Sequence, residues 1–357
     1  MICVFIIIYA AYEINSYKMR NSAPVSALAV KDNKVYCGLG GHLHVYDVRS
    51  KSKLVSSLVL KDGSCIRGFD FRDGEALTFG GKSVAILDTK SWKIKNVLSF
   101  KDWIMIAKFD ENYDDGKGDE LYLGFAHNFV RFRGLERWCS ARCLLYSMAF
   151  YLTKSDDLIV ASGTVFGDII VWNPKTMTKT ITLQGHDGSI FGVVFSGDGT
   201  QLCTISDDRT VRLWNLETGS LMWKQFGHKA RIWDVTFLGT DRVVTVSEDS
   251  TCRVWNRDNG ECVSTWTGHS GYHAWSVATN AEGTFVVSGG SDGAVGLKFR
   301  SLFLSLSLSL SLLLLLLLHT LVHIHTHTHT NNNNEPGTRM GRQRTRSNYI
   351  METEIKE

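Results

Sequence analysis

The sequence predicts an all-β fold, a seven-bladed β-propeller, and two observations lead to this prediction. First, a phrase recurs along the chain: Gly-His pairs begin at Gly185, Gly227 and Gly268, which are 42 and 41 residues apart. Second, each unit consists of short runs of alternating apolar and polar residues separated by Gly, Asp and Asn turns, as in antiparallel strands. One such unit cannot bury its apolar faces alone, so stacked copies that close into a ring are expected.

The third strand of each unit can be followed back to the start of the chain. In the best-preserved units this strand ends in a tryptophan, and other residues take the same position elsewhere. The steps between these positions are 41, 45, 40, 42, 41 and 43 residues, so seven units fit along the chain. The seven positions are Tyr46, Leu87, Phe132, Trp172, Trp214, Trp255 and Lys298.

The fifth unit illustrates the strands that are expected in each blade. Residues 197–199 read Gly-Asp-Gly, which favours a hairpin turn between the first two strands. The four expected strands are residues 189–195, 201–205, 210–215 and 220–225. The same pattern, with weaker signals, extends over a predicted propeller domain at residues 21–299.

The amino-terminal segment, residues 1–20, begins with an apolar run over residues 1–12. This run lacks the basic region and small-residue cleavage site of a signal peptide, which remains the alternative interpretation. The seventh unit lacks an outermost strand of its own. We therefore expect residues 1–12 to supply that strand and close the ring.

The carboxy-terminal part changes abruptly in composition. Residues 300–334 contain a Ser-Leu alternation that runs into six leucines over 305–318, and a His-Thr alternation over 325–330. Repeated TC and CA dinucleotides encode Ser-Leu and His-Thr, so this tract is interpreted as translated simple-sequence DNA. The alternative is a transmembrane helix over residues 301–324, which is long enough to span a bilayer. Residues 335–357 are polar and predicted to be disordered.

Composition excludes several classes of function. A net charge of +3 and a pI near 8.3 fall short of the concentrated basic stripe of an autonomous nucleic-acid binder. The eight cysteines form no C-x-x-C pair, so reduced thiols in a cytoplasmic protein are expected and a metal site is not. The sequence contains no P-loop, H-E-x-x-H, G-x-S-x-G or dinucleotide fingerprint, so we expect no catalytic residue and no cofactor.

The Gly-His…Trp period resembles that of WD40 repeats. The resemblance implies that each unit holds a buried hydrogen-bonded set of a histidine, a serine or threonine, a turn aspartate and a tryptophan. We expect a structural role, because buried polar atoms must be paired, the arrangement recurs and no nucleophile accompanies it. In the seventh unit Gly290 and Lys298 replace two members, so that set is expected to be broken. The two complete sets are His186, Ser206, Asp208 and Trp214, and His228, Ser247, Asp249 and Trp255.

Phrases outside the repeat consensus resemble the amino-terminal propeller of the WD repeat-containing protein 6 family. They include Trp103-Ile104, residues 188–191, and the Ala-Arg-Ile-Trp of residues 230–233 after a Gly-His pair. The resemblance implies a regulatory subunit that acts in the cytoplasm with an FtsJ-type methyltransferase on the ribose at tRNA position 34. The methyltransferase would bind S-adenosylmethionine, and this chain would contact tRNA indirectly or weakly.

Family members are longer than this chain, so the resemblance implies a first propeller rather than a whole protein. No membrane association is expected despite the leucine-rich tract. The alternative is a general interaction propeller in signalling or ubiquitin-ligase assembly, because the same fold supports both.

Partner contacts of propellers concentrate in the loops after Gly-His and near the turn aspartate. Arginine and aromatic residues are the usual anchors of such interfaces. The candidates are Arg209, Lys229, Arg231, Tyr272 and His273.

Overall fold

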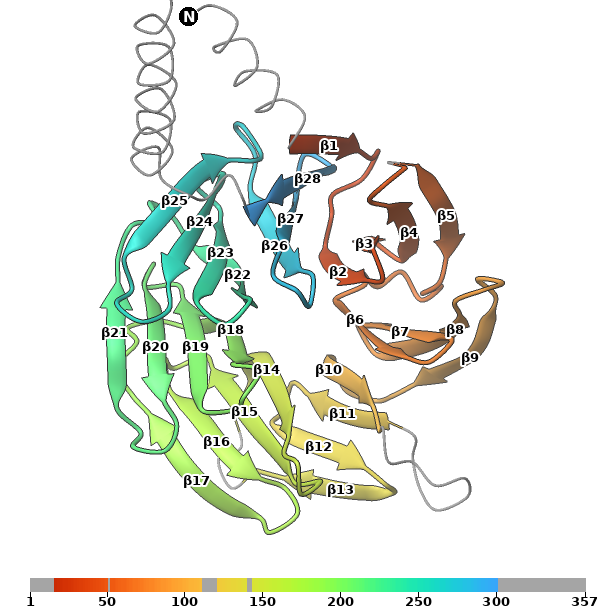
Figure 1. Cartoon of the computed structure of the whole chain (residues 1–357). Coiled ribbons are helices and arrows are strands. Elements are labelled where there is room, and N and C mark those ends of the chain that lie inside the picture. The colour runs from red at the N-terminus through yellow and green to blue at the C-terminus, as the bar shows by residue number, and fades with distance from the viewer. Residues whose placement is uncertain (1–15, 51, 111–120, 140–142, 301–357) are drawn as a thin grey trace, which may run out of the picture. The chain divides into compact units, whose positions relative to one another are not determined.

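In the described residues, 28 strands form seven four-stranded antiparallel sheets that surround a common centre like the blades of a propeller (Figure 1). The computed structural model describes residues 16–50, 52–110, 121–139 and 143–300. All of them belong to the first of two compact units, Met1–Ser305 and Leu306–Glu357. The predicted seven-bladed propeller is confirmed.

The blades follow the chain, and in the first six the strands run outward in sequence order. Blade 1 is β2 (Ala27–Lys31), β3 (Lys34–Leu39), β4 (His42–Asp47) and β5 (Lys53–Leu58); blade 2 is β6 (Gly68–Arg72), β7 (Glu75–Gly80), β8 (Ser83–Asp88) and β9 (Ile94–Ser99). Blade 3 is β10 (Ile104–Phe109), β11 (Leu121–Phe125), β12 (Phe129–Phe132) and β13 (Leu135–Trp138); blade 4 is β14 (Leu145–Leu152), β15 (Leu158–Thr164), β16 (Ile169–Asn173) and β17 (Thr178–Leu183).

The last three blades include the best-preserved repeats. Blade 5 is β18 (Ile190–Phe195), β19 (Gln201–Ser206), β20 (Val211–Asn215) and β21 (Leu221–Gln225); blade 6 is β22 (Ile232–Leu238), β23 (Arg242–Ser247), β24 (Thr251–Asn256) and β25 (Cys262–Thr267). Blade 7 is β26 (Ala274–Thr279), β27 (Phe285–Gly290), β28 (Ala294–Phe299) and β1 (Ser16–Arg20). All seven positions traced from the sequence lie in the third strand of their blades, as predicted.

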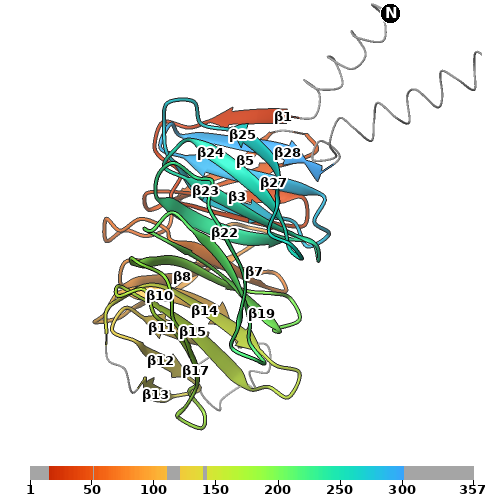
Figure 2. The ribbon, with the colours of Figure 1, turned by 90° about the vertical axis from the view of Figure 1, so that its left-hand side faces the viewer.

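The outermost strand of blade 7 comes from the other end of the chain. β1 pairs antiparallel with β28, from Ser16 opposite Lys298 to Arg20 opposite Ala294, and the two strands lie side by side in Figure 2. Met19 on β1 is buried in the core between blades 7 and 1. The amino-terminal segment 1–20 therefore supplies the closing strand, but at residues 16–20 rather than in the apolar run 1–12, which lies outside the described residues. The edge of β28 needs a strand whose side chains alternate between core and solvent, and Lys18 and Met19 provide that alternation.

The apolar core is divided into clusters that each fill the space between two adjacent blades. The cluster between blades 5 and 6, for example, joins Leu213 and Trp223 of one blade to Ile232 and Val243 of the next. An equivalent cluster closes the ring, because Val287 and Leu297 pack with residues of β3 and β4. Each blade is therefore stabilised mainly by its two neighbours.

The first strands form the inner ring, and polar side chains tie some of them together. The Asp234 carboxylate on β22 accepts hydrogen bonds from Ser276 Oγ at 3.1 Å and from the Val277 amide at 2.9 Å on β26. Ser276 Oγ in turn accepts from the Leu28 amide on β2 at 3.1 Å. Burial raises the pKa of Asp234 to about 6, although these hydrogen bonds oppose the shift. Asp234 thus links three blades at an electrostatic cost.

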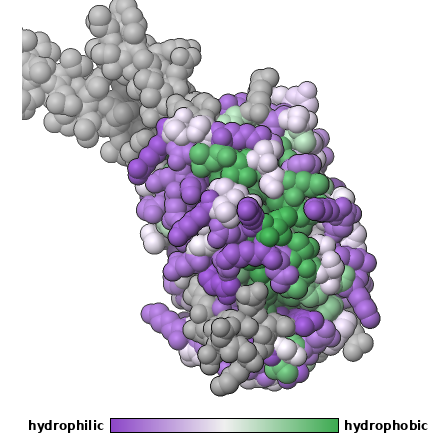
Figure 3. Space-filling model, turned by 90° about the vertical axis from the view of Figure 1, so that its right-hand side faces the viewer, coloured by the Kyte–Doolittle hydropathy of each residue, from purple (hydrophilic) through white to green (hydrophobic). Residues whose placement is uncertain are grey.

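The outer surface of blades 1 and 2 carries apolar side chains. Seen from that side, hydrophobic residues form a band bordered by hydrophilic ones (Figure 3). The outermost strands there expose Leu54 and Leu58 on β5 and Val97 on β9. In the described part of the chain, no helix is long and apolar enough to cross a bilayer, and the segment 301–324 lies outside that part.

Candidate partner-binding face

Two kinds of loop lie at the same end of the blades: the loops that lead into each first strand, and the turns between each second and third strand. In blade 5, Ile190 at the start of β18 pairs with Ser206 at the end of β19, and Ile205 pairs with Val211 at the start of β20. We call this end the loop face. All five predicted partner residues belong to its loops.

A buried hydrogen-bonded set holds the loop face of blade 5. His186 Nδ1 lies 2.9 Å from Asp208 Oδ2, and His186 Nε2 lies 2.8 Å from Thr204 Oγ1. The indole N–H of Trp214 donates to the same Thr204 oxygen at 2.9 Å. The hydroxyl of the set is therefore that of Thr204, and the expectation of Ser206 is corrected.

The sheet register explains this correction. Trp214 lies opposite Leu202, so its indole reaches the diagonal neighbour Thr204 on the same face of the sheet, and Ser206 is two residues farther along the strand. Ser206 Oγ instead accepts a hydrogen bond from the Asp208 amide at 3.2 Å. Ser206 thus holds the turn, while Thr204 joins His186 to Trp214.

The protonation states follow from burial and hydrogen bonding. Burial lowers the pKa of His186, although the hydrogen bond with Asp208 opposes this, so the ring is neutral at pH 7. Burial alone would raise the pKa of Asp208, but hydrogen bonds from His186 and Thr210 outweigh it and hold the pKa well below its usual range. A neutral His186 that donates from Nδ1 accepts the Thr204 hydroxyl proton at Nε2. Both ring nitrogens are thereby engaged in holding the turn.

Blade 6 repeats the arrangement. His228 Nδ1 lies 3.1 Å from Asp249 Oδ2 and His228 Nε2 lies 2.8 Å from Thr245 Oγ1, which accepts from Trp255 Nε1 at 2.8 Å. Thr245 again takes the place expected for Ser247. The Ser247 hydroxyl donates to the Arg231 carbonyl at 2.8 Å and accepts from the Asp249 amide at 3.1 Å. The same diagonal geometry accounts for both blades.

Blade 7 keeps more of the set than the sequence suggested. His269 Nδ1 lies 2.8 Å from Asp292 Oδ1, and His269 Nε2 lies 3.1 Å from Ser288 Oγ, so a hydroxyl is present two residues before Gly290. The tryptophan is absent, and the ammonium of Lys298 lies 4.5 Å from the centre of the Trp266 ring instead. The expectation of a broken set thus holds for the tryptophan position and is wrong for the hydroxyl. As in blade 5, the hydroxyl comes from the residue two positions before the one expected.

The predicted arginines lie at the boundary between blades 5 and 6. Arg231 Nε binds Asp207 Oδ1 at 2.7 Å, and its guanidinium lies 5.2 Å from the Phe191 ring centre and 5.3 Å from that of Trp233. Arg231 therefore connects the two blades. Lys229 is exposed, and its amide donates to a turn carboxylate of blade 6.

Arg209 adopts a strained backbone conformation next to this contact. Its φ of 63° lies in the left-handed region, and the equivalent turn position is Ser250 with φ 69° in blade 6 and Gly293 with φ 68° in blade 7. An arginine in this conformation costs about 1 kcal/mol relative to glycine. Its exposed side chain forms no ion pair within the described residues, whereas its amide donates a hydrogen bond to the Ser206 carbonyl at 3.1 Å that holds the turn. Strain of this kind is typical of functional positions.

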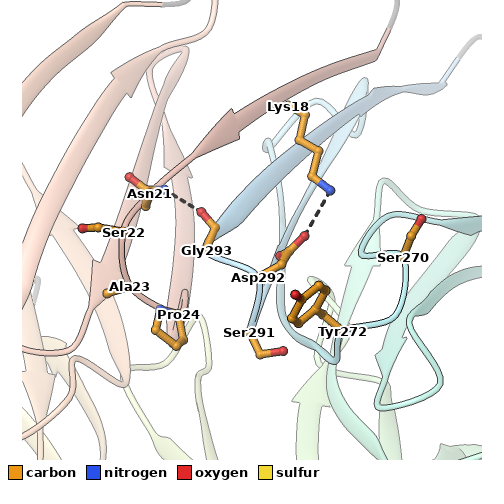
Figure 4. A pocket seen from close by; sticks show the side chains of 10 residues that line it. All are labelled: Lys18, Asn21, Ser22, Ala23, Pro24, Ser270, Tyr272, Ser291, Asp292 and Gly293. Carbon is orange, nitrogen blue, oxygen red and sulfur yellow. Dashed lines mark hydrogen bonds and ion pairs between the residues drawn. The ribbon is translucent and has the colours of Figure 1, made fainter.

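Tyr272 and His273 lie farther around the ring, at the boundary between blades 6 and 7. The Glu248 carbonyl of blade 6 accepts a hydrogen bond from His273 Nδ1 at 3.1 Å. Tyr272 is exposed and lines a pocket of about 480 Å³ between blade 7 and the segment after β1 (Figure 4). Lys18 lies across that pocket in an ion pair with Asp292 at 3.0 Å. The five predicted residues therefore form an arc over blades 5 to 7 rather than one cluster.

Sequence reasoning missed a row of aromatic side chains on the same face. A β-bulge in the first strand skips one residue in each of blades 4 to 7, and these residues are Tyr146, Phe191, Trp233 and Trp275. The Tyr146 and Phe191 rings are stacked with centres 5.2 Å apart, and the Phe191 and Trp233 centres are also 5.2 Å apart. Within the described ranges, Trp233 Nε1 is buried without a hydrogen-bond partner. In each of these blades an aromatic residue directly follows the buried residue that starts the first strand, and this pattern could have revealed the row. The β-bulge that takes the aromatic residue out of the strand pairing has no sequence signature.

The chemistry available on this face is recognition. The His–Asp pairs are occupied by structural hydrogen bonds, and in the described ranges no three histidine, cysteine or acidic side chains gather as metal ligands would. What the face exposes is aromatic rings and cations on well-anchored turns, which are typical of surfaces that bind macromolecules.

Comparison with known proteins agrees with this geometry. Residues 177–215, 219–256 and 260–297 match the family described as WD domain, G-beta repeat. The chain is a WD40 repeat protein. Each matched WD40 segment runs from the outermost strand of one blade to the third strand of the next, for example from β17 to β20. The repeat therefore spans the blade boundary at which the loop-face contacts lie.

The chain also has distant similarity to longer proteins. It is 26% identical over 317 residues to the tRNA (34-2'-O)-methyltransferase regulator WDR6 of Mus musculus, which covers 77% of this chain and 27% of that protein. The protein of the same name in Drosophila melanogaster is 26% identical over 174 residues, or 40% of this chain and 17% of its own length. DDB1- and CUL4-associated factor 13 of Dictyostelium discoideum is 33% identical over 78 residues, or 21% of this chain and 18% of that protein. The chain thus spans about a quarter of the length of the murine regulator it matches.

Proposed function

We propose that this chain is a non-catalytic WD40 scaffold that regulates a tRNA 2′-O-methyltransferase acting at anticodon position 34. The observation that carries the proposal is the extent of its similarity to proteins named as such regulators. That similarity covers 77% of the chain, whereas the WD40 family match begins at residue 177. The segment after residue 177 is too short to contain 77% of the chain, so the similarity includes earlier blades in which the repeat signature is weak. A shared repeat motif alone does not account for it.

The division of labour follows from the chemistry of the loop face. The partner methyltransferase binds S-adenosylmethionine and transfers the methyl group. This chain presents a rigid surface to it, because the buried sets around His186, His228 and His269 fix the turns before binding. A preorganised surface loses less conformational entropy when a partner docks. We place this activity in the cytoplasm.

The test is co-purification of the full chain with the cognate methyltransferase, followed by a measurement of ribose methylation at position 34 of tRNA. We expect the two proteins to form a stable complex and methylation to increase over that of the methyltransferase alone. A complex without methylation would mean that regulation requires the parts of the longer relatives that this chain does not match. Absence of a complex with folded chain would contradict the proposal and favour a general interaction propeller.

A further inference from the structure

Loops of blades 1 to 3, together with Tyr146 on β14 of blade 4, form a second exposed surface on the loop face, which adjoins the predicted arc where Tyr146 stacks on Phe191. We call it the basic patch, and it consists of Lys61, Arg67, Lys82, Lys101, Trp103 and Tyr146. All six side chains are exposed, with Trp103 at 55% and Tyr146 at 41%. These residues include neither the partner residues predicted from the sequence nor any member of the buried sets.

Hydrogen bonds hold the basic patch together across three blades. The Ser83 hydroxyl, next to Lys82, donates to Asp62 Oδ2 at 2.7 Å, next to Lys61. The Lys82 carbonyl accepts from the amide of Phe100 at 2.8 Å, which precedes Lys101. These contacts place three lysines on adjoining loops.

Arg67 connects the lysines to the aromatic row. Its Nη2 donates to the Tyr146 carbonyl at 2.6 Å, which joins blade 2 to blade 4 across the mouth of the ring. Tyr146 is the end of the stack that continues to Phe191 and Trp233. One end of that stack is therefore open beside an exposed guanidinium.

The cations of the basic patch are available to a ligand. Within the described part of the chain none of the four forms an ion pair with a carboxylate. The two acidic residues on the same loops are already engaged: Asp62 accepts from Ser64 and Ser83, and Asp102 lies 2.8 Å from His127 Nδ1. The four cations outnumber these two carboxylates, so the patch is positively charged although the whole chain is close to neutral.

We propose that the basic patch binds single-stranded RNA, with phosphates against the four cations and unpaired bases stacked on Trp103 and Tyr146. The proposal rests on the proposed function, because it makes this face the place where the scaffold holds the RNA substrate. Lysines are depleted at protein–protein interfaces but are common phosphate ligands. Exposed rings and cations on one surface match the way proteins bind unpaired bases, which are free to stack on a ring as paired bases are not. These two properties favour RNA over a protein partner.

The experiment is a titration of the full chain into a fluorescein-labelled oligouridylate of about 12 nucleotides, read by fluorescence anisotropy at several salt concentrations. Trp103→Ala should weaken binding about tenfold, because stacking on one ring contributes roughly that factor. Lys82→Ala with Lys101→Ala should reduce the slope of log Kd against log salt by about 1.4, or about 0.7 per lost phosphate contact. A duplex of the same length should bind at least several-fold more weakly than the single strand.

The matched control is Lys229→Ala, which removes an exposed cation from the arc over blades 5 to 7. It should leave oligouridylate binding unchanged. Because Trp103 and both lysines are exposed, the melting temperatures of all variants should equal that of the native chain, and this is measured alongside. Equal affinity of the Trp103→Ala variant, equal binding of duplex, or an equal effect of Lys229→Ala would overturn the proposal. So would the absence of saturable binding by the native chain up to about 100 µM.

Co-purification with the methyltransferase, repeated with each variant, separates the two proposals. Loss of oligouridylate binding by Trp103→Ala with intact methyltransferase capture supports the RNA assignment. Loss of capture with intact oligouridylate binding assigns the basic patch to the protein partner and overturns it. If even the native chain captures no methyltransferase, the proposed function fails, while the titration still decides the RNA assignment by itself.

Discussion

Replacing Thr204 by valine should destabilise blade 5 far more than its small change in shape suggests. Thr204 is fully buried, and its hydroxyl joins Trp214 Nε1 at 2.9 Å to His186 Nε2 at 2.8 Å. Valine has nearly the same volume but leaves the indole N–H and the imidazole nitrogen buried without partners. Each of these two groups, buried without a partner, costs about 1–3 kcal/mol, so we expect a loss of roughly 2–6 kcal/mol in the free energy of unfolding.

The matched control is Ser206→Ala on the same strand. Ser206 Oγ accepts one backbone hydrogen bond, from Asp208 at 3.2 Å, and its loss should cost about 1 kcal/mol. By differential scanning calorimetry, Thr204→Val should lower the melting temperature by roughly 4–10 °C and Ser206→Ala by about 2 °C. If Ser206→Ala lowers it as much as Thr204→Val does, the assignment of the bridging hydroxyl is wrong.

Three further outcomes are expected. Burial raises the folded-state pKa of Asp234 to about 6, above its ordinary 3.8, so the ionised form is penalised above pH 6 and the penalty fades as pH falls towards 3.8. Asp234→Asn should therefore melt above the native chain at pH 8, by the equivalent of about 3 kcal/mol, and converge with it near pH 4; a difference independent of pH would contradict this. Met19→Ala should lower the free energy of unfolding by about 2–3 kcal/mol, because Met19 anchors β1 in the core. Lys18→Ala should lower it by less than about 1 kcal/mol in the same melting assay, because the ion pair of Lys18 is partly exposed. Combining Arg209→Gly, which relieves the left-handed strain, with Arg231→Ala should weaken methyltransferase capture about tenfold with little loss of stability, and unchanged affinity in a pull-down titration would exclude both residues from the interface.

The sequence was sufficient for the architecture because repetition and turn chemistry are local signals. In the fifth unit, the expected strands 189–195 and 201–205 are observed as Ile190–Phe195 and Gln201–Ser206. The position of the closing strand was less accessible. The apolar run led the prediction to residues 1–12. Pairing with β28 depends instead on the register of the strand, and the alternation of exposed Lys18 with buried Met19 provides it. Hydrophobicity alone does not reveal that register.

The candidate site was only partly accessible for a related reason. Motif positions identified His186, Asp208 and Trp214, whose contacts follow from the repeat. The choice between Thr204 and Ser206 depended on the diagonal reach of an indole across two strands, which is a three-dimensional property. The basic patch escaped notice because blades 1 to 3 lack the Gly-His signature. Its residues lie far apart in the chain and meet only when the ring has formed.

Closure by β1 also determines when the ring can close during synthesis of the chain. β1 leaves the ribosome before any other described strand, yet its partner β28 is synthesised last among them, with Ser16 opposite Lys298. At ordinary elongation rates this leaves an interval of roughly 15–60 s in which β1 is complete and has no partner. Without blade 7 the first six blades cannot form a closed ring, and the two ends of the open arc expose core residues such as Val35 of blade 1 and Val254 of blade 6. The ring can close only if β1 is still free when β28 is made. Binding of β1 by a chaperone, a fusion partner or another nascent chain during this interval would therefore determine whether the chain closes into a ring or aggregates.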